Sequence, residues 1–333
     1  MIRIAVDAMG GDRGPEEIVA GALDARSERV VPLIVGPRGL DTHGLELIEA
    51  HDVIAMDEKP TEAVRAKPDS SLVTACRAVR EEKAQAVVSA GNTGAMLAAC
   101  LLEIRRLPGV RRPAIAVTIP SRSGASVLLD AGANADARLE DLLQFAHMGA
   151  VFAQEILDVR NPEIRLLSIG EEPEKGNQLT LEAHELLAAS DLNFAGNTEG
   201  RDLLRGGADI VVTDGFTGNV ALKLLEGTIG NLLEAMREEI TATTRGKLGG
   251  LLIRPAARRL RTRLDPDTYG GAYLLGLRGL AVIAHGNSSR RAITNAVRLA
   301  ARGVEHVVVG RLGERLRDTV LESATSTTTP TPT

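Results

Sequence analysis

Short aliphatic runs alternate along this chain with longer segments whose apolar residues recur every three or four positions. Ile18, Ala22 and Ala25 show this helical spacing. When strands and helices alternate in this way, right-handed crossover connections join the strands into a largely parallel sheet. The helices then cover both faces of that sheet. The sequence therefore predicts an α/β fold of three layers, α/β/α. The predicted strands are residues 2–6, 30–35, 53–56, 86–89, 114–119, 126–129, 164–169 and 210–213.

The length of 333 residues fits either two domains or one large α/β unit. We predict one large α/β domain over residues 1–312, from which a basic segment at 240–264 protrudes. Residues 323–333 are almost entirely Ser, Thr and Pro, so they cannot bury apolar surface and are predicted to be disordered.

Composition excludes several classes of protein. Aromatic residues make up 2% of the chain, which leaves few rings for stacking on bases, and the net charge of −5 also argues against nucleic-acid binding. No apolar run approaches the roughly 20 residues of a bilayer span. Residues 1–7 enter a strand pattern at once, so we expect no signal peptide and a cytoplasmic protein. Cys76 and Cys100 lack the spacing of a metal or redox motif, and we expect two buried thiols rather than a disulfide.

Loops rich in Gly, Asn, Asp and Thr follow five of the predicted elements. In open parallel sheets, ligands bind where the carboxyl ends of strands meet, and helix N-termini there suit an anion. Each loop alone could serve only a tight turn, but five of the same chemistry indicate a site. The loops are residues 7–12, 89–94, 130–134, 169–177 and 213–219.

The segment 240–264 carries seven basic residues and no acidic one. Without these seven, 32 basic residues face 44 acidic ones, a balance of −12. Apolar residues recur in it at helical spacing, and Pro255 suits the first turn of a helix. The segment is either a solvated helix packed on the domain or an amphipathic arm for an anionic membrane or an acidic partner. The predicted contact residues are Arg245, Lys247, Leu251, Leu252, Ile253, Arg254, Arg258, Arg259, Leu260, Arg261 and Arg263.

The loop motifs together resemble one family, the PlsX-type phosphate acyltransferases. The resemblance covers residues 1 to about 310 in order and spacing. Its motifs include DAMGGD at 7–12, SAGNTGA at 89–95, LLDAGAN at 128–134, GNTEGRD at 196–202, DGFTGN at 214–219 and YGGA at 269–272.

The resemblance implies transfer of an acyl group from acyl carrier protein to inorganic phosphate, giving acyl-phosphate for phospholipid biosynthesis. It also implies a fold shared with phosphotransacetylases and isocitrate dehydrogenases, a homodimer, and peripheral association with the membrane. We expect no cofactor and no metal.

Phosphate is already a nucleophile, so this chemistry needs no activated Ser or Cys, and no G-x-S-x-G elbow is present. The enzyme has to position phosphate beside the thioester and stabilise an oxyanion. Lys175 and Asn219 are our candidates for that stabilisation, although Lys175 could be a surface lysine. His285 is a candidate general acid toward the leaving thiolate, its alternative being a hydrogen-bonded strand-end histidine. The predicted phosphate-binding residues are Gly91, Asn92, Thr93, Gly94, Thr217 and Gly218.

Two other functions compete with this one. An NAD(P)-dependent decarboxylating dehydrogenase of related fold would need a dinucleotide fingerprint, and the glycines after the first predicted strand have the wrong spacing for one. A non-catalytic scaffold docked on a membrane through residues 240–264 would leave the five strand-end loops unexplained.

Overall fold

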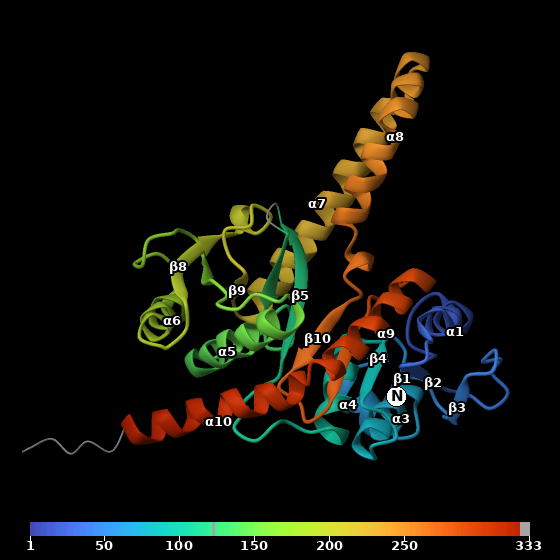
Figure 1. The fold of residues 1–333 in the computed structure, drawn as a ribbon, viewed down its shortest axis with the longest axis horizontal. Coiled ribbons are helices and arrows are strands. Elements are labelled where there is room, and N and C mark those ends of the chain that lie inside the picture. The colour runs from blue at the N-terminus through green and yellow to red at the C-terminus, as the bar shows by residue number, and fades with distance from the viewer. Residues whose placement is uncertain (122–123, 327–333) are drawn as a thin grey trace, which may run out of the picture.

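The computed structural model describes residues 1–121 and 124–326, in which eleven strands form one sheet (Figure 1). The strands are β1 Ile2–Asp7, β2 Val30–Gly36, β3 Glu46–Glu49, β4 Ala86–Ser89, β5 Ala114–Ser121, β6 Gly124–Leu129, β7 Ile164–Ser168, β8 Phe194–Glu199, β9 Ile210–Val212, β10 Ala272–Leu275 and β11 Leu280–Ile283. Their order across the sheet is β3-β2-β1-β4-β11-β10-β5-β6-β9-β7-β8.

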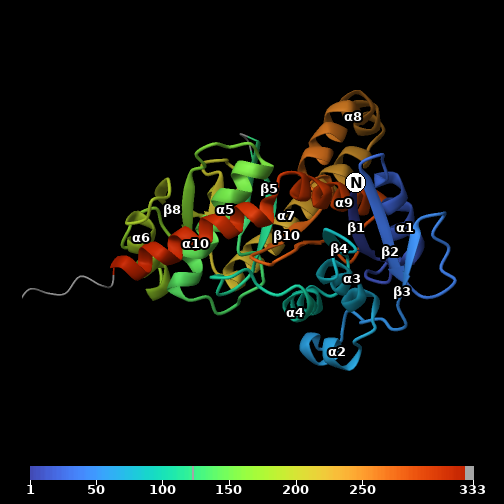
Figure 2. The same ribbon diagram turned by 60° about the horizontal axis from the view of Figure 1, so that its bottom comes forward.

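Helices cover both faces of this sheet, which confirms the predicted three-layer α/β fold. They are α1 Gly14–Ala25, α2 Pro60–Ala66, α3 Ser71–Arg80, α4 Thr93–Glu103, α5 Leu139–Ile156, α6 Gln178–Ala188, α7 Gly215–Thr241, α8 Thr244–Leu264, α9 Arg290–Glu305 and α10 Val308–Ser326. One core cluster joins α1, α5, α6, α9 and α10 to the sheet, and a second joins α2, α3, α4 and the start of α7 to the other face (Figure 2). Cys76 and Cys100 are both buried and free in the second cluster, as expected.

The sheet consists of two sets of parallel strands that run in opposite directions. The first set is β3, β2, β1, β4 and β11, and the second is β6, β9, β7 and β8. Strands β10 and β5 lie between the sets. Because β10 is antiparallel to both β11 and β5, and β5 is antiparallel to β6, direction reverses across the centre.

The register brings the carboxyl ends of the two sets to the same level of the sheet. One row of paired residues crosses the centre of the molecule. In it, Ser89 and Ile283 are the last residues of β4 and β11, and Leu128 and Val211 stand one residue before the ends of β6 and β9. Loops from both sets therefore meet beside the middle of β5. The row runs Ser89, Ile283, Ala272, Val117, Leu128 and Val211.

Some predicted strands differ from the structure. The strand expected at residues 53–56 is wrong, because the edge strand is β3, whose Glu-Leu-Ile-Glu sequence is half exposed and shows no apolar run. Ile54 is buried without belonging to a strand. Strands β8, β10 and β11 were not predicted. The Phe-Ala-Gly-Asn-Thr-Glu sequence of β8 is largely polar and has no apolar run.

Helices α7 and α8 form a hairpin that projects from the body (Figure 1). Helix α8 begins at Thr244, capped by the Thr243 hydroxyl, which accepts from the Gly246 N–H at 3.0 Å. Pro255 lies inside α8, so the expected helix start at Pro255 is wrong. Helix α8 buries none of its residues, so water reaches the backbone carbonyl that Pro255 leaves without a donor.

At the other end of the chain, α10 runs to Ser326 and includes residues 323–326 of the segment predicted to be disordered. Residues 327–333 lie outside the described residues. None of the helices in the described part of the chain combines the length and apolarity needed to cross a bilayer.

Candidate active site

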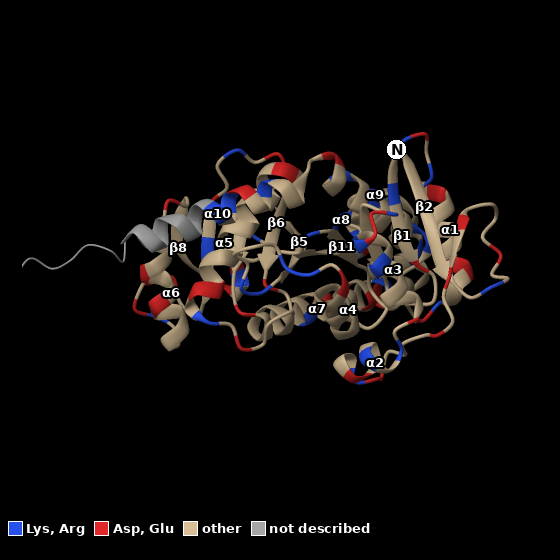
Figure 3. Cartoon of the chain, turned by 90° about the horizontal axis from the view of Figure 1, so that it is seen from below, with Lys and Arg blue, Asp and Glu red and all other residues tan. Residues whose placement is uncertain are grey.

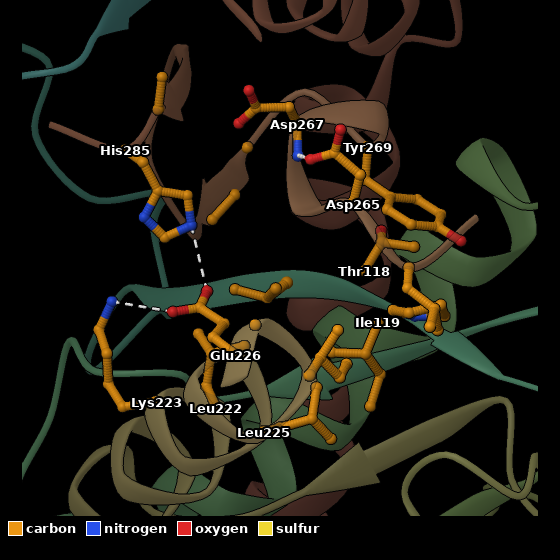
Figure 4. Close-up of a pocket in the computed structure, with 18 of the residues that line it drawn as sticks. Thr118, Ile119, Leu222, Lys223, Leu225, Glu226, Asp265, Asp267, Tyr269 and His285 are labelled. Atoms are coloured by element: carbon orange, nitrogen blue, oxygen red, sulfur yellow. Dashed lines mark hydrogen bonds and ion pairs between the residues drawn. The ribbon is translucent and has the colours of Figure 1, made fainter. Parts of the chain in front are cut away.

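A cavity of about 1450 Å³ opens where the carboxyl ends of the two strand sets meet, and it continues along α7 (Figure 4). Five of the predicted catalytic and phosphate-binding residues line it, and Arg254, Arg258 and Arg261 of the predicted contact residues line the part beside α8. Gly91, Thr93 and Gly94 come from the loop after β4 and the start of α4, Asn219 from the first turns of α7, and His285 from the loop after β11.

The loop after β4 is held by a buried carboxyl group. The Ser89 hydroxyl donates to Asp7 Oδ2 at 2.7 Å and accepts from the Gly91 N–H at 3.0 Å. Burial raises the pKa of Asp7, although hydrogen bonds from Ser71 and Ser89 partly oppose this. A Cβ on Gly10 would lie 2.6 Å from Asp7 Oδ2, so only glycine fits there. The chain Asp7–Ser89–Gly91 thus fixes the entry to α4.

Helix α4 points its N-terminus at the cavity. The N–H groups of Thr93 and Gly94, in its first turn, have no intrahelical acceptor and suit an anion. Asn92 caps this helix: its Oδ1 accepts from the Ala95 N–H at 3.0 Å, and its Nδ2 donates to the Met56 carbonyl, also at 3.0 Å. Asn92 therefore positions the helix and does not line the cavity.

The start of α7 packs tightly on the loop after β6. A Cβ on Gly218 would overlap the backbone carbonyl oxygen of Asp130, and Thr217 donates its hydroxyl to Asp214 Oδ2 at 2.6 Å. Thr217 and Gly218 thus hold the loop and lie outside the cavity lining. Asn219 lies over Gly132 and faces the cavity, and its side-chain amide has no hydrogen-bond partner among the described residues.

The Asp130 carboxylate braces its own loop. Its Oδ1 accepts from three backbone N–H groups and its Oδ2 from the backbone and side chain of Asn134. These five donors occupy the oxygens that a metal ion would need. Nowhere in residues 1–121 and 124–326 do three His, Cys, Asp or Glu side chains gather as a metal site would require.

A carboxylate joins a lysine and a histidine side chain in the cavity (Figure 4). Glu226 Oε1 lies 3.1 Å from His285 Nε2, and Glu226 Oε2 lies 3.1 Å from Lys223 Nζ. Burial alone would raise the pKa of Glu226, but the hydrogen bond and charge of His285, with Lys223, lower it overall. The carboxylate therefore stays ionised and holds the imidazole in one orientation.

Lys223 and Glu226 were not predicted from the sequence. Both lie on the helix face of Asn219, four and seven residues further along α7, which is the spacing at which side chains share one face. Helical periodicity counted from Asn219 is the signal that points to them.

Lys175 is not brought to the cavity. It is exposed in the loop after β7, where its carbonyl oxygen accepts from the Ser168 hydroxyl at 2.7 Å. Strands β6 and β9 separate β7 from β5, so the sheet order itself keeps this loop away from the cavity.

The basic residues of the projecting hairpin are exposed. None of the seven in α8 forms an ion pair with a carboxylate in the described part of the chain. By contrast, acidic and basic residues are interspersed over the body (Figure 3). Leu251 and Leu252, which are 63% and 85% exposed, add apolar surface to the same helix.

Comparison with known proteins decides the family. A family model described as a fatty acid synthesis protein matches residues 2–311. The chain belongs to this family. A phosphate acyltransferase of Heliobacterium modesticaldum is 45% identical, with 95% of this chain and 98% of that protein covered. One of Thermosynechococcus vestitus is 47% identical, with 96% of each covered. The resemblance to PlsX-type enzymes is thereby confirmed, and the chain is an acyltransferase.

Solved structures of related fold support the architecture. A phosphotransacetylase from Streptococcus pyogenes has a TM-score of 0.61 at 18% identity, over 91% of this chain and 94% of that one. A branched-chain phosphotransacylase from Enterococcus faecalis has a TM-score of 0.60 at 18% identity, over 92% of this chain and 100% of that one. The phosphotransacetylase-like fold is confirmed.

Proposed function

We propose that this chain transfers a fatty acyl group from acyl carrier protein to inorganic phosphate, releasing acyl-phosphate for phospholipid biosynthesis. The observation that carries the proposal is the meeting, in one cavity, of the open N-terminus of α4 with Asn219 and the Glu226–His285 pair. The names of the curated relatives, phosphate acyltransferases, support it.

The mechanism needs two steps. Phosphate, held by the Thr93 and Gly94 N–H groups, attacks the thioester carbonyl carbon, so that a C–O bond forms and the carbonyl oxygen becomes an oxyanion. The Asn219 amide donates to that oxyanion. The C–S bond then breaks, and His285, oriented by Glu226, protonates the leaving thiolate. Lys175 takes no part in this mechanism, because it lies outside the cavity lining.

We further propose that the basic residues of α8 contact the acidic carrier protein, an anionic membrane, or both, and that the enzyme is cytoplasmic and peripherally membrane-associated. The exposed cationic and apolar side chains of α8 support this docking.

We also propose a homodimer, as the resemblance implies. Sedimentation velocity at micromolar concentration tests it, and a single species of 35.2 kDa would contradict it.

The deciding assay measures the release of acyl carrier protein from its acyl thioester with and without inorganic phosphate. We expect release only with phosphate, together with an equal amount of acyl-phosphate. Equal release without phosphate would show hydrolysis of the thioester and would overturn the proposed function. Binding of NAD(P)⁺ in calorimetry, with no release of acyl carrier protein, would favour the dehydrogenase instead.

A further inference from the structure

The wall of the cavity that α7 supplies is apolar over much of its length. Leu222, Leu225, Ile229 and Leu233 line it, at the spacing of one helix face. Strand β5 contributes Val117, Ile119 and Pro120 to the lining of the same cavity. Ile119 is labelled in Figure 4. This apolar groove, defined by these seven residues, begins one turn beyond Asn219, where the proposed reaction takes place.

The groove is distinct from the outer surface of the same helix. Leu222 is only 9% exposed and the other three α7 residues of the groove are half-buried. Leu224 and Leu232, on the other side of α7, are 69% and 59% exposed. The groove residues therefore face β5 and the cavity, whereas their immediate neighbours face solvent.

The groove also has a defined end. Beyond Leu233 the α7 wall becomes charged, with Glu234, Arg237 and Glu238. Helix α8 adds Arg254, Arg258 and Arg261 to the lining of the same cavity. From Leu222 to Leu233 the helix rises about 16 Å. With carbon–carbon bonds of about 1.5 Å, this is the span of roughly a dozen methylene groups.

We propose that the apolar groove binds the alkyl chain of the acyl donor, with the carbonyl at Asn219, and that Ile229 and Leu233 set the preferred chain length. The proposal rests on the proposed function. A linear alkyl chain fits for two reasons: the groove is continuous with the polar end of the cavity that holds the reacting groups, and its α7 wall changes from apolar to charged beyond Leu233.

The first experiment measures kcat/KM for a series of saturated acyl donors of increasing length. Each methylene that enters the groove should raise kcat/KM by about fourfold, until the groove is filled at roughly a dozen methylenes. Ile229→Trp should move this limit about five methylenes shorter, since about 6 Å of groove is lost. Ile229→Ala, which adds no bulk, should lower kcat/KM for long donors and leave that for the shortest unchanged.

The matched control is Leu232→Trp, on the solvent side of α7 and adjacent to Leu233. We expect Leu233→Trp to shorten the limit by one or two methylenes and Leu232→Trp to leave the chain-length profile as it is. An unchanged profile in Ile229→Trp, or an equal shift in Leu232→Trp, would overturn the proposal.

A second readout does not depend on activity. The chain contains no Trp, so Ile229→Trp and Leu232→Trp each introduce a single fluorophore. Dodecyl phosphate, added below its micelle concentration, should shift the emission of the Ile229→Trp variant to shorter wavelength and leave that of Leu232→Trp unchanged. If no acyl donor is turned over but this emission shift occurs, the proposed function is wrong, whereas the binding of an alkyl chain in the apolar groove is supported. The absence of a shift would overturn the groove.

Discussion

At the residue scale, the most informative contact is the one that Glu226 makes with His285. A histidine at a strand end is ambiguous in a sequence, because it serves equally well as a hydrogen-bonded structural residue. The structure places it 3.1 Å from a half-buried carboxylate, in a cavity that also holds Asn219. This partner gives His285 a fixed orientation toward the proposed reaction centre.

Glu226→Gln should lower kcat by on the order of 10²-fold, because the uncharged amide no longer stabilises a protonated His285. The KM for phosphate should stay near that of the unaltered enzyme, since the α4 N–H groups are untouched. Steady-state kinetics at saturating donor checks both values. Glu239→Gln, at an exposed position on the same helix, is the control. A loss of less than threefold in kcat would reduce Glu226 to a surface ion-pair residue.

At the element scale, helix ends decide the geometry of the site. The sequence assigned one role, phosphate binding, to all the selected residues of the loop after β4. In the structure, the residues of this loop have different roles. Thr93 and Gly94 present N–H groups to the cavity, whereas Asn92 caps helix α4. Sequence could not separate these roles, because capping side chains and ligand-facing N–H groups occur in the same Gly/Asn/Thr motifs.

Asn92→Ala should raise the KM for phosphate severalfold and lower the free energy of unfolding by about 1 kcal/mol, because the cap on α4 is lost. Asn92→Asp keeps an acceptor for the Ala95 N–H and should retain more of the stability. Phosphate saturation curves and urea titrations on the two variants provide the measurements. Phosphate saturation indistinguishable between Asn92→Ala and the unaltered enzyme would contradict the placement of phosphate at α4.

The projecting hairpin gives the second prediction at this scale. Reversal of three charges, Arg258→Glu, Arg259→Glu and Arg261→Glu, should abolish sedimentation with anionic vesicles or raise the KM for the carrier substrate. These side chains are exposed and form no ion pairs with described residues, so the melting temperature should hardly change.

The control carries the same change of charge on the body, at exposed Arg26, Arg29 and Arg160. Each cation near an anionic surface contributes about 1 kcal/mol. Unchanged vesicle binding and unchanged carrier kinetics in the α8 variant would remove the docking role of the hairpin. A variant that unfolds would favour the packed-helix interpretation instead.

At the scale of the whole molecule, the sequence predicted the layers and the loops but not how the strands are ordered. Alternation of strands and helices reveals which segments are strands, whereas strand direction depends on which strands become neighbours. Lys175 shows the consequence. Its loop has the same glycine-rich chemistry as the others, yet β6 and β9 lie between its strand and the cavity. Only the three-dimensional pairing separates it from Asn219.

The stability of the whole fold should depend on pH through a buried histidine. His147, on α5, has an Nδ1 that finds no hydrogen-bond partner among the described residues. Burial, with Arg315, lowers the pKa of His147 to about 4. In the unfolded chain the pKa lies near 6.5, so the unfolded state binds the proton first. The free energy of unfolding is therefore unaffected by His147 above about pH 6.5. As the pH falls from 6.5 toward 4, protonation of this histidine in the unfolded state lowers the free energy of unfolding by roughly 3 kcal/mol.

Urea unfolding at pH 7.5 and at pH 4.5 measures this change. In His147→Leu the free energy of unfolding should fall less between these pH values than in the unaltered protein. His43→Asn removes an exposed histidine and serves as the control, because asparagine tolerates the positive φ of 49° found there. Equal pH dependence in His147→Leu and the unaltered protein would contradict the assignment.

The central position of β10 and β11 has a consequence for the order in which the protein is completed during synthesis. These strands come last among the described strands of the chain, yet they join β4 to β5 in the middle of the sheet. In a nascent chain that has emerged only as far as β9, the sheet is still divided into two parts. The Gly91 loop follows β4 in one part, and β9, the strand before Asn219, belongs to the other. The two pieces are joined only after Ile283 has left the ribosome. Such long-range closure is slow, because the ends of a long loop must meet before the contacts form. Until then, two unpaired sheet edges, those of β4 and β5, remain open to other chains.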